Sequence, residues 1–149
     1  MYDIKKLKQL REETEVSFSL CKKALEESKN DMTLAKKLLS KWGVAKAQDK
    51  SGRSTGAGII FSYVHHNKKV ASLIQLACET DFVSGNKDFQ ALGQELAMQV
   101  ASVMSETNEE LLDQEYIRDP SKKISDLIKD AVLKFGENIQ VVKFVRWSV

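Results

Sequence analysis

Residues 59–78 read IIFSYVHHNKKVASLIQLAC, and this stretch decides the fold class of the chain. Two segments rich in β-branched and aromatic residues, Ile59–Val64 and Val70–Cys78, flank the polar tetrad His65–Lys68. Short apolar segments joined by a polar turn are typical of an antiparallel β-hairpin. The stretch therefore predicts a sheet in a chain whose other segments have helical patterns.

The segments after the hairpin complete one α+β unit. Asn86 can cap a long helix, and a second helix is expected to start at Asp119–Ser121 and to stop at Gly136. Residues 139–149 form a last strand with apolar residues on both faces, which predicts a central place in the sheet. Residues 59–149 are therefore expected to form a three-stranded, mostly antiparallel sheet covered by two helices.

The segment before the hairpin has a different pattern. Residues 1–43 contain three short amphipathic helical segments, with Ser17 and Asp31 as N-cap candidates for the second and third. Gly43 is expected to end the third helix. Residues 44–58 are polar, contain three of the seven glycines and are expected to be a linker. The predicted fold class is therefore α+β, with an N-terminal three-helix bundle followed by a small three-stranded antiparallel sheet packed with helices.

Composition and charge argue against several classes of protein. The 149 residues carry 23 Lys and Arg against 21 Asp and Glu, a net charge of +2 that is too near neutral for a dedicated nucleic-acid binder. No apolar run approaches the roughly 20 residues needed to cross a membrane, and the N-terminus lacks the apolar stretch of a secretory signal. We therefore expect a cytoplasmic protein with neither nucleic acid nor membrane as its partner.

The residue types that carry chemistry are not arranged as a catalytic or metal site. The glycine-rich stretch Gly52–Gly58 precedes a strand, whereas phosphate-binding loops precede a helix, so we expect a flexible connection there. His65 and His66 are adjacent and have no further His or Cys nearby, which favours exposed turn residues over metal ligands. Cys21 lies on an apolar helix face and Cys78 far away, as reduced, buried thiols do. The sequence predicts no enzyme, no cofactor and no metal.

Two features suggest binding of a protein partner. Arg11 and Lys22 lie near Phe18 in the basic helical segment, although composition alone favours a solvated face around a small core. Phe82 follows Asp81 in an expected loop at the end of a strand. An aromatic side chain there can act as a wedge into a partner, or it can pack under its own sheet, and the pattern leaves both alternatives open.

Three groups of residues carry a resemblance to a known family. LREET at residues 10–14 is followed by CKKAL at 21–25, TDFV occupies 80–83, and DPSK at 119–122 precedes GENI at 136–139. In this order and spacing they resemble the bacterial elongation factor Ts family, over nearly the whole chain. Two departures are clear: Glu15-Val16 replaces the family's Gly-Ala, and Ser19-Leu20 replaces Met-Asp.

The resemblance implies a fold, a partner and a function. The bundle at 1–43 is similar to ubiquitin-associated modules and would contact the GTPase elongation factor Tu, and 59–149 would be a core domain of the dimerisation type. The implied function is guanine-nucleotide exchange: promoting GDP release from elongation factor Tu during translation elongation, by disturbing its Mg²⁺ and phosphate site. The implied partner is elongation factor Tu, GDP-bound or nucleotide-free, and pairing of two copies of the chain is left open.

The resemblance also implies two sets of partner-binding residues. The set in the N-terminal module, which would touch a helix of the GTPase domain, is Arg11, Phe18, Ser19 and Lys22. The set that would dislocate Mg²⁺ from elongation factor Tu is Thr80, Asp81, Phe82 and Val83. The rival interpretation is a non-catalytic adaptor that binds a protein partner through the three-helix module. An adaptor has no use for a wedge at 80–83, so the intact motif favours nucleotide exchange.

Overall fold

The computed structural model describes residues 1–149 and contains seven helices and five strands. The helices are α1 (Ile4–Thr14), α2 (Phe18–Glu27), α3 (Met32–Lys50), α4 (Asp81–Ser84), α5 (Lys87–Ser102), α6 (Asn108–Asp113) and α7 (Ile124–Phe135). The strands are β1 (Ala57–Val64), β2 (Val70–Cys78), β3 (Glu115–Tyr116), β4 (Asp119–Lys123) and β5 (Gln140–Ser148). None of the helices combines the length and the apolar character that crossing a membrane requires.

The main sheet has three antiparallel strands in the order β1-β2-β5, which confirms the predicted hairpin and fold class. Ile74 pairs with Phe61 on one side and with Phe144 on the other. The predicted central place of the last strand is wrong, because β2 is central and β5 is an edge. Apolar residues lie on both faces of β5 because the uncovered face of the sheet is itself apolar, with Val142 and Trp147 exposed.

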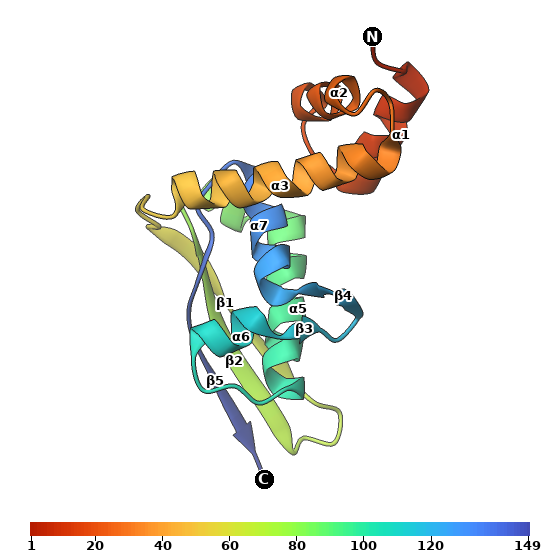
Figure 1. The fold of residues 1–149 in the computed structure, drawn as a ribbon. Helices are drawn as coiled ribbons and strands as arrows, with labels where there is room; N and C mark the ends of the chain where they lie inside the picture. Colours follow the sequence, from red (N-terminus) through yellow and green to blue (C-terminus); the bar gives the residue numbers. More distant parts are fainter.

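Helices α5 and α7 cover one face of this sheet and form the larger core (Figure 1). Fourteen buried residues make up that core, among them Phe61 of β1, Ile74 of β2 and Phe89 of α5. The rings of Phe61 and Phe89 lie 6.2 Å apart between centroids, a distance typical of favourable aromatic pairs. The other face of the sheet has no helix over it (Figure 1).

Helices α1, α2 and the first half of α3 form the N-terminal bundle with a second, smaller core. Ser17 and Asp31 cap α2 and α3 through their side chains, as the sequence predicts. Leu133 of α7 is also a member of this smaller core, so the bundle packs against the sheet domain. Helix α3 lies across one end of the sheet domain, and the two chain termini are at opposite ends of an elongated molecule (Figure 1).

The predicted end of the third helix at Gly43 is wrong, because α3 continues to Lys50 and includes the first half of the expected linker at 44–58. Gly43 is buried, and a Cβ at its position would lie 3.5 Å from the side chain of Leu133. The glycine therefore serves close packing of α3 on α7 rather than helix termination. The residues after it, AKAQDK, are mostly good helix formers and extend the helix.

Three connecting segments also differ from the predictions. The expected helix start at Asp119–Ser121 is strand β4, which pairs with β3, and α7 begins only at Ile124. Here Asp119 Oδ1 accepts bonds from the Ser121 backbone and hydroxyl, a local bonding pattern that favours a turn over a helix. The expected loop after Thr80 contains the single turn α4, and the acidic connector at 106–115 contains α6.

Candidate partner-binding site

The motif Thr80–Val83 lies at the end of β2 and forms a short projection, here called the tip (residues 80–84). Thr80 is the N-cap of α4, and its Oγ1 accepts a bond of 3.4 Å from the Val83 backbone N–H. Val83 is buried in the main core, whereas Phe82 exposes 90% of its surface. The tip is therefore anchored through Val83 and presents Phe82 to solvent.

The exposure of Phe82 decides between the two alternatives that the sequence left open. Packing of Phe82 under its own sheet is wrong, and the buried member of the apolar pair is Val83. Burial of a Phe side chain is favourable by about 1.5–3 kcal/mol, and Phe82 does not gain this free energy within its own chain. A partner with an apolar pocket can supply that burial.

The base of the tip is bonded to the connection between α7 and β5. The Glu137 carboxylate accepts bonds from the backbone N–H groups of Glu79 and Thr80, both at 3.0 Å, and from the Thr80 hydroxyl at 2.7 Å. In return, the Glu79 carboxylate accepts a bond of 2.8 Å from the Asn138 backbone N–H. It also forms an ion pair of 2.7 Å with Arg53 Nε.

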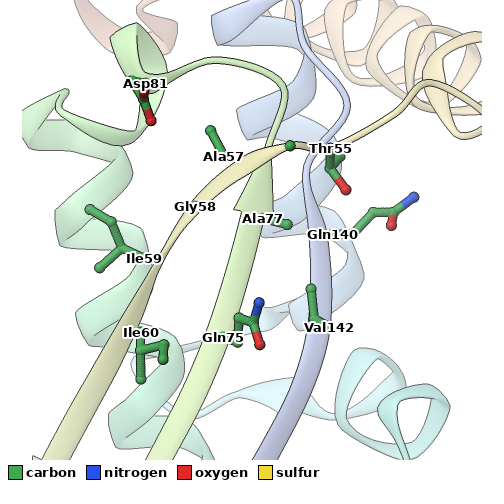
Figure 2. Close-up of a pocket in the computed structure, with 11 residues that line it drawn as sticks. Thr55, Ala57, Gly58, Ile59, Ile60, Gln75, Ala77, Asp81, Gln140 and Val142 are labelled. Carbon is green, nitrogen blue, oxygen red and sulfur yellow. The ribbon is translucent and has the colours of Figure 1, made fainter.

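Beside the tip, a cavity of about 650 Å³ opens on the uncovered face of the sheet (Figure 2). Gln75, Ala77 and Val142 line its floor on neighbouring strands, and Asp81 lies at its end (Figure 2). The lining mixes amide, carboxylate and aliphatic groups without a cluster of charges. Such a surface suits a protein side chain or segment better than a phosphate or a metal.

The N-terminal set of predicted residues lies on the last turn of α1 and the first half of α2. Arg11 and Ser19 are exposed, and Phe18 exposes 49% of its surface as the first residue of α2. Lys22 is half-buried because its Nζ lies 5.0 Å from the centroid of the Tyr2 ring. The structure therefore brings these four residues to one region of the bundle, separate from the tip.

A lysine that the sequence did not single out connects the two regions. Lys134 Nζ forms an ion pair with Glu15 of the bundle and another, of 2.6 Å, with Asp88 in the first turn of α5. Burial lowers the pKa of Lys134, but its bonds to Asp88 and Glu15 outweigh this effect and raise the pKa above its usual value. Glu15 has a positive φ of 56°, a conformation that favours Gly.

The remaining chemistry-bearing groups form no centre. No group of three or more His, Cys, Asp and Glu side chains is arranged to hold a metal ion. Cys21 and Cys78 are buried and unpaired, and burial raises the pKa of both thiols, which disfavours the nucleophilic thiolate. Glu137 was within reach of sequence reasoning, since it belongs to the quoted GENI motif, whereas Lys134 gave no signal.

Comparisons with known proteins agree with the resemblance. The family model described as Elongation factor TS matches residues 79–149. The chain is 36% identical to elongation factor Ts of Thermosipho melanesiensis over 194 aligned residues, which cover all of this chain and 99% of that protein. It is 35% identical to elongation factor Ts of Coprothermobacter proteolyticus, with coverage of 96% and 95%. Elongation factor Ts of Aquifex aeolicus is 39% identical, and the match covers 99% of this chain and 52% of that protein.

These matches extend over both the N-terminal bundle and the sheet domain. The identity exceeds 30% along essentially the full length of two relatives, and the family model covers the tip and everything after it. The chain therefore belongs to the elongation factor Ts family.

Proposed function

We propose that this chain is a guanine-nucleotide exchange factor that promotes GDP release from elongation factor Tu during translation elongation. The observation that carries the proposal is the exposed Phe82 in an intact Thr80–Val83 motif, in a chain of this family. The partner is elongation factor Tu in its GDP-bound and nucleotide-free states. The chain itself makes and breaks no covalent bond, so it is not an enzyme, and it acts in the cytoplasm, where bacterial translation occurs.

In the proposed mechanism, Asp81 and Phe82 insert between helices of the GTPase and disturb its Mg²⁺ and phosphate site. Bound GDP owes much of its affinity to the metal and to backbone donors around its phosphates, so a small displacement of either weakens the nucleotide. The exchange factor and GDP then lower each other's affinity by the same ratio. GTP refills the emptied site, and the exchange factor leaves.

We propose two units for this task. Residues 1–43 form the module that contacts the GTPase domain through Arg11, Phe18, Ser19 and Lys22. Residues 59–149 form the core domain that carries the tip. The partly exposed aromatic ring of Phe18 beside basic side chains supports the first assignment, because aromatic and Arg side chains are enriched in protein interfaces.

We also propose that two copies of the chain pair through the uncovered face of the sheet. Several apolar side chains on this face are exposed: Ile60, Val64, Leu73, Val142, Val145 and Trp147. A contiguous apolar face of this kind is typical of an interaction surface. Ile60→Glu is expected to convert a dimer into a monomer in analytical ultracentrifugation, and a wild-type chain that sediments as a monomer at all concentrations would contradict the pairing.

Stimulated release of a fluorescent GDP analogue tests the proposed function. Elongation factor Tu of the same source is loaded with the analogue, and its release is followed with and without this chain. We expect marked acceleration that saturates with the concentration of the chain. Binding without acceleration would contradict the exchange function and favour the adaptor alternative. A salt-dependent affinity for RNA would contradict the expected absence of nucleic-acid partners.

A further inference from the structure

We propose that Glu137 is a positioning residue for the tip: its carboxylate fixes the direction in which Phe82 projects. The inference deepens the proposed exchange function and rests on it. It begins from the geometry at the base of the tip, where one carboxylate accepts three bonds from two consecutive residues, Glu79 and Thr80. Bonds to a charged acceptor are stronger than neutral ones, so this carboxylate is a firm attachment point.

The tip depends on such an attachment because α4 has only four residues. A single helical turn is unfavourable to nucleate and does not hold its own orientation. Phe82 is almost fully exposed and gains no orientation from packing. The position of its ring is therefore set by the backbone at Thr80 on one side and by buried Val83 on the other.

Thr80 links the two functions of this backbone. Its hydroxyl donates to Glu137 Oε2 at 2.7 Å, which aims the Oγ1 lone pairs at α4, where the N–H of Val83 donates at 3.4 Å. The same side chain thus receives the first turn of α4 and attaches it to the connection after α7. Loss of the Glu137 carboxylate removes the fixed point while leaving the apolar anchor Val83 in place.

A second set of bonds makes the attachment rigid. The Glu79 carboxylate accepts from the Asn138 N–H and pairs with Arg53, and the buried Asn138 side chain donates to the Arg53 carbonyl at 2.8 Å. Three segments, at residues 51–53, 79–80 and 137–138, are thereby joined into one hydrogen-bonded unit. Such a network holds its members in one arrangement more firmly than separate bonds do.

The test compares Glu137→Ala with Glu137→Gln in stimulated GDP release. We expect Glu137→Ala to lower the maximal release rate about tenfold with little change in the half-saturating concentration, since a misplaced group loses rate before it loses binding. Glu137→Gln keeps one oxygen acceptor for the two backbone N–H groups and should recover part of the rate. Glu95→Ala is the matched control, because it removes bonds from Tyr116 and Arg118 at a different part of the core.

A double-mutant cycle separates positioning from general stability. If Glu137 acts through Phe82, Glu137→Ala causes no further loss of rate in a Phe82→Ala background. Additive losses, or a Glu137→Ala protein that exchanges GDP as fast as the wild type, would overturn the proposal.

Amide hydrogen exchange provides a readout that does not depend on the exchange function. The N–H groups of Glu79 and Thr80 should lose protection in Glu137→Ala, while the central strand β2 keeps it. Unchanged protection at both residues would refute the attachment itself. A wild-type chain that fails to release GDP, with protection lost in Glu137→Ala, would instead refute the proposed function and leave the attachment standing.

Discussion

Lys22 illustrates how one residue of the N-terminal set can serve both its own fold and a partner. Its ammonium group lies over the Tyr2 ring, at a distance where a cation–π contact at a half-exposed site contributes about 0.5–1 kcal/mol. Its charge nevertheless remains partly accessible beside Arg11 and Phe18. A lysine in this position can therefore contact an acidic or polar group of another protein without leaving its place on the bundle.

Lys22→Ala is expected to weaken binding to elongation factor Tu by about 1 kcal/mol, the size typical of contacts outside interface hot spots. Isothermal titration of the nucleotide-free partner measures the effect. Lys69→Ala, an exposed lysine in the β1–β2 turn, is the matched control and should bind like the wild type. Equal affinities for Lys22→Ala and the wild type would place the N-terminal contact elsewhere.

Among the elements, α5 and β1 approach each other closely at Gly93. A methyl group at this position would overlap the ring of Phe61, which is buried in the main core. Ala favours a helix by about 1 kcal/mol over Gly, but overpacking of a core costs about 1–3 kcal/mol. We expect Gly93→Ala to lower the free energy of unfolding by about 2 kcal/mol in urea denaturation. Gly52→Ala, which meets no atom within 4 Å, is the control, and equal stability of both variants would contradict this packing argument.

The β3–β4 hairpin is attached to α5 through a bond from the Tyr116 hydroxyl to Glu95, at 2.7 Å. Burial, and next this bond, raise the pKa of Tyr116 from 10.0 to about 12. The neutral phenol is therefore favoured in the folded state, and its contribution to stability is complete below pH 10 and is lost as the pH rises towards 12.

Tyr116→Phe should lower the free energy of unfolding by about 1 kcal/mol at neutral pH, the usual net value of one hydrogen bond. The difference from the wild type should disappear above the pKa of the folded protein, as measured by urea denaturation across the alkaline range. Tyr2→Phe is the control. A tyrosine at 116 that ionises at its ordinary pKa in an ultraviolet titration would contradict the attachment.

The elements that could be predicted from the sequence are those with strong local signals. The hairpin, the capped starts of α2 and α3, and the stop of α7 at Gly136 follow from alternation and capping residues. The end of α3 could not be predicted, because Gly43 is retained for its contact with Leu133, which is 90 positions away in the chain. The edge position of β5 was missed because an apolar uncovered face imitates a strand buried on both sides.

At the scale of the whole molecule, the bundle and the sheet domain are joined by α3 and α7. Leu133 of α7 belongs to the core of the bundle, and its neighbour Lys134 bonds to Glu15 in the bundle and to Asp88 beside the tip. The two proposed contact regions are therefore held in a defined relation. Glu15 stands where the family's pattern has Gly, so this chain combines a strained backbone position with an ion pair.

Lys134→Met is expected to loosen this junction. It should lower the free energy of unfolding by about 1 kcal/mol and speed tryptic cleavage between α3 and β1, because one lysine then no longer bridges two carboxylates. Because its folded-state pKa is raised above 10.5, the contribution of Lys134 is complete at neutral pH and is lost only as the pH rises through that folded-state value. Lys129→Met on the same helix is the control, and equal cleavage rates for the two variants would contradict the bridge.

The candidate site was partly within reach of the sequence. The motif Thr80–Val83 identified the tip, and the basic residues near Phe18 identified the bundle region. Whether Phe82 or Val83 is buried depends on how the turn after β2 is closed, and only the fold decides that. Glu137 meets Thr80 from 57 positions away, so its role appears only when the two segments are brought together.

The most direct test of the account is stimulated GDP release by Phe82→Ala, with Met104→Ala, another exposed apolar residue, as its control. Because Phe82 is exposed, its truncation should change the free energy of unfolding by no more than about 0.5 kcal/mol. We predict that the variant keeps its fold and much of its binding to elongation factor Tu, and that its maximal rate of GDP release falls at least about tenfold, which corresponds to about 1.4 kcal/mol. A folded Phe82→Ala protein that releases GDP as fast as the wild type would contradict the claim that this side chain drives exchange.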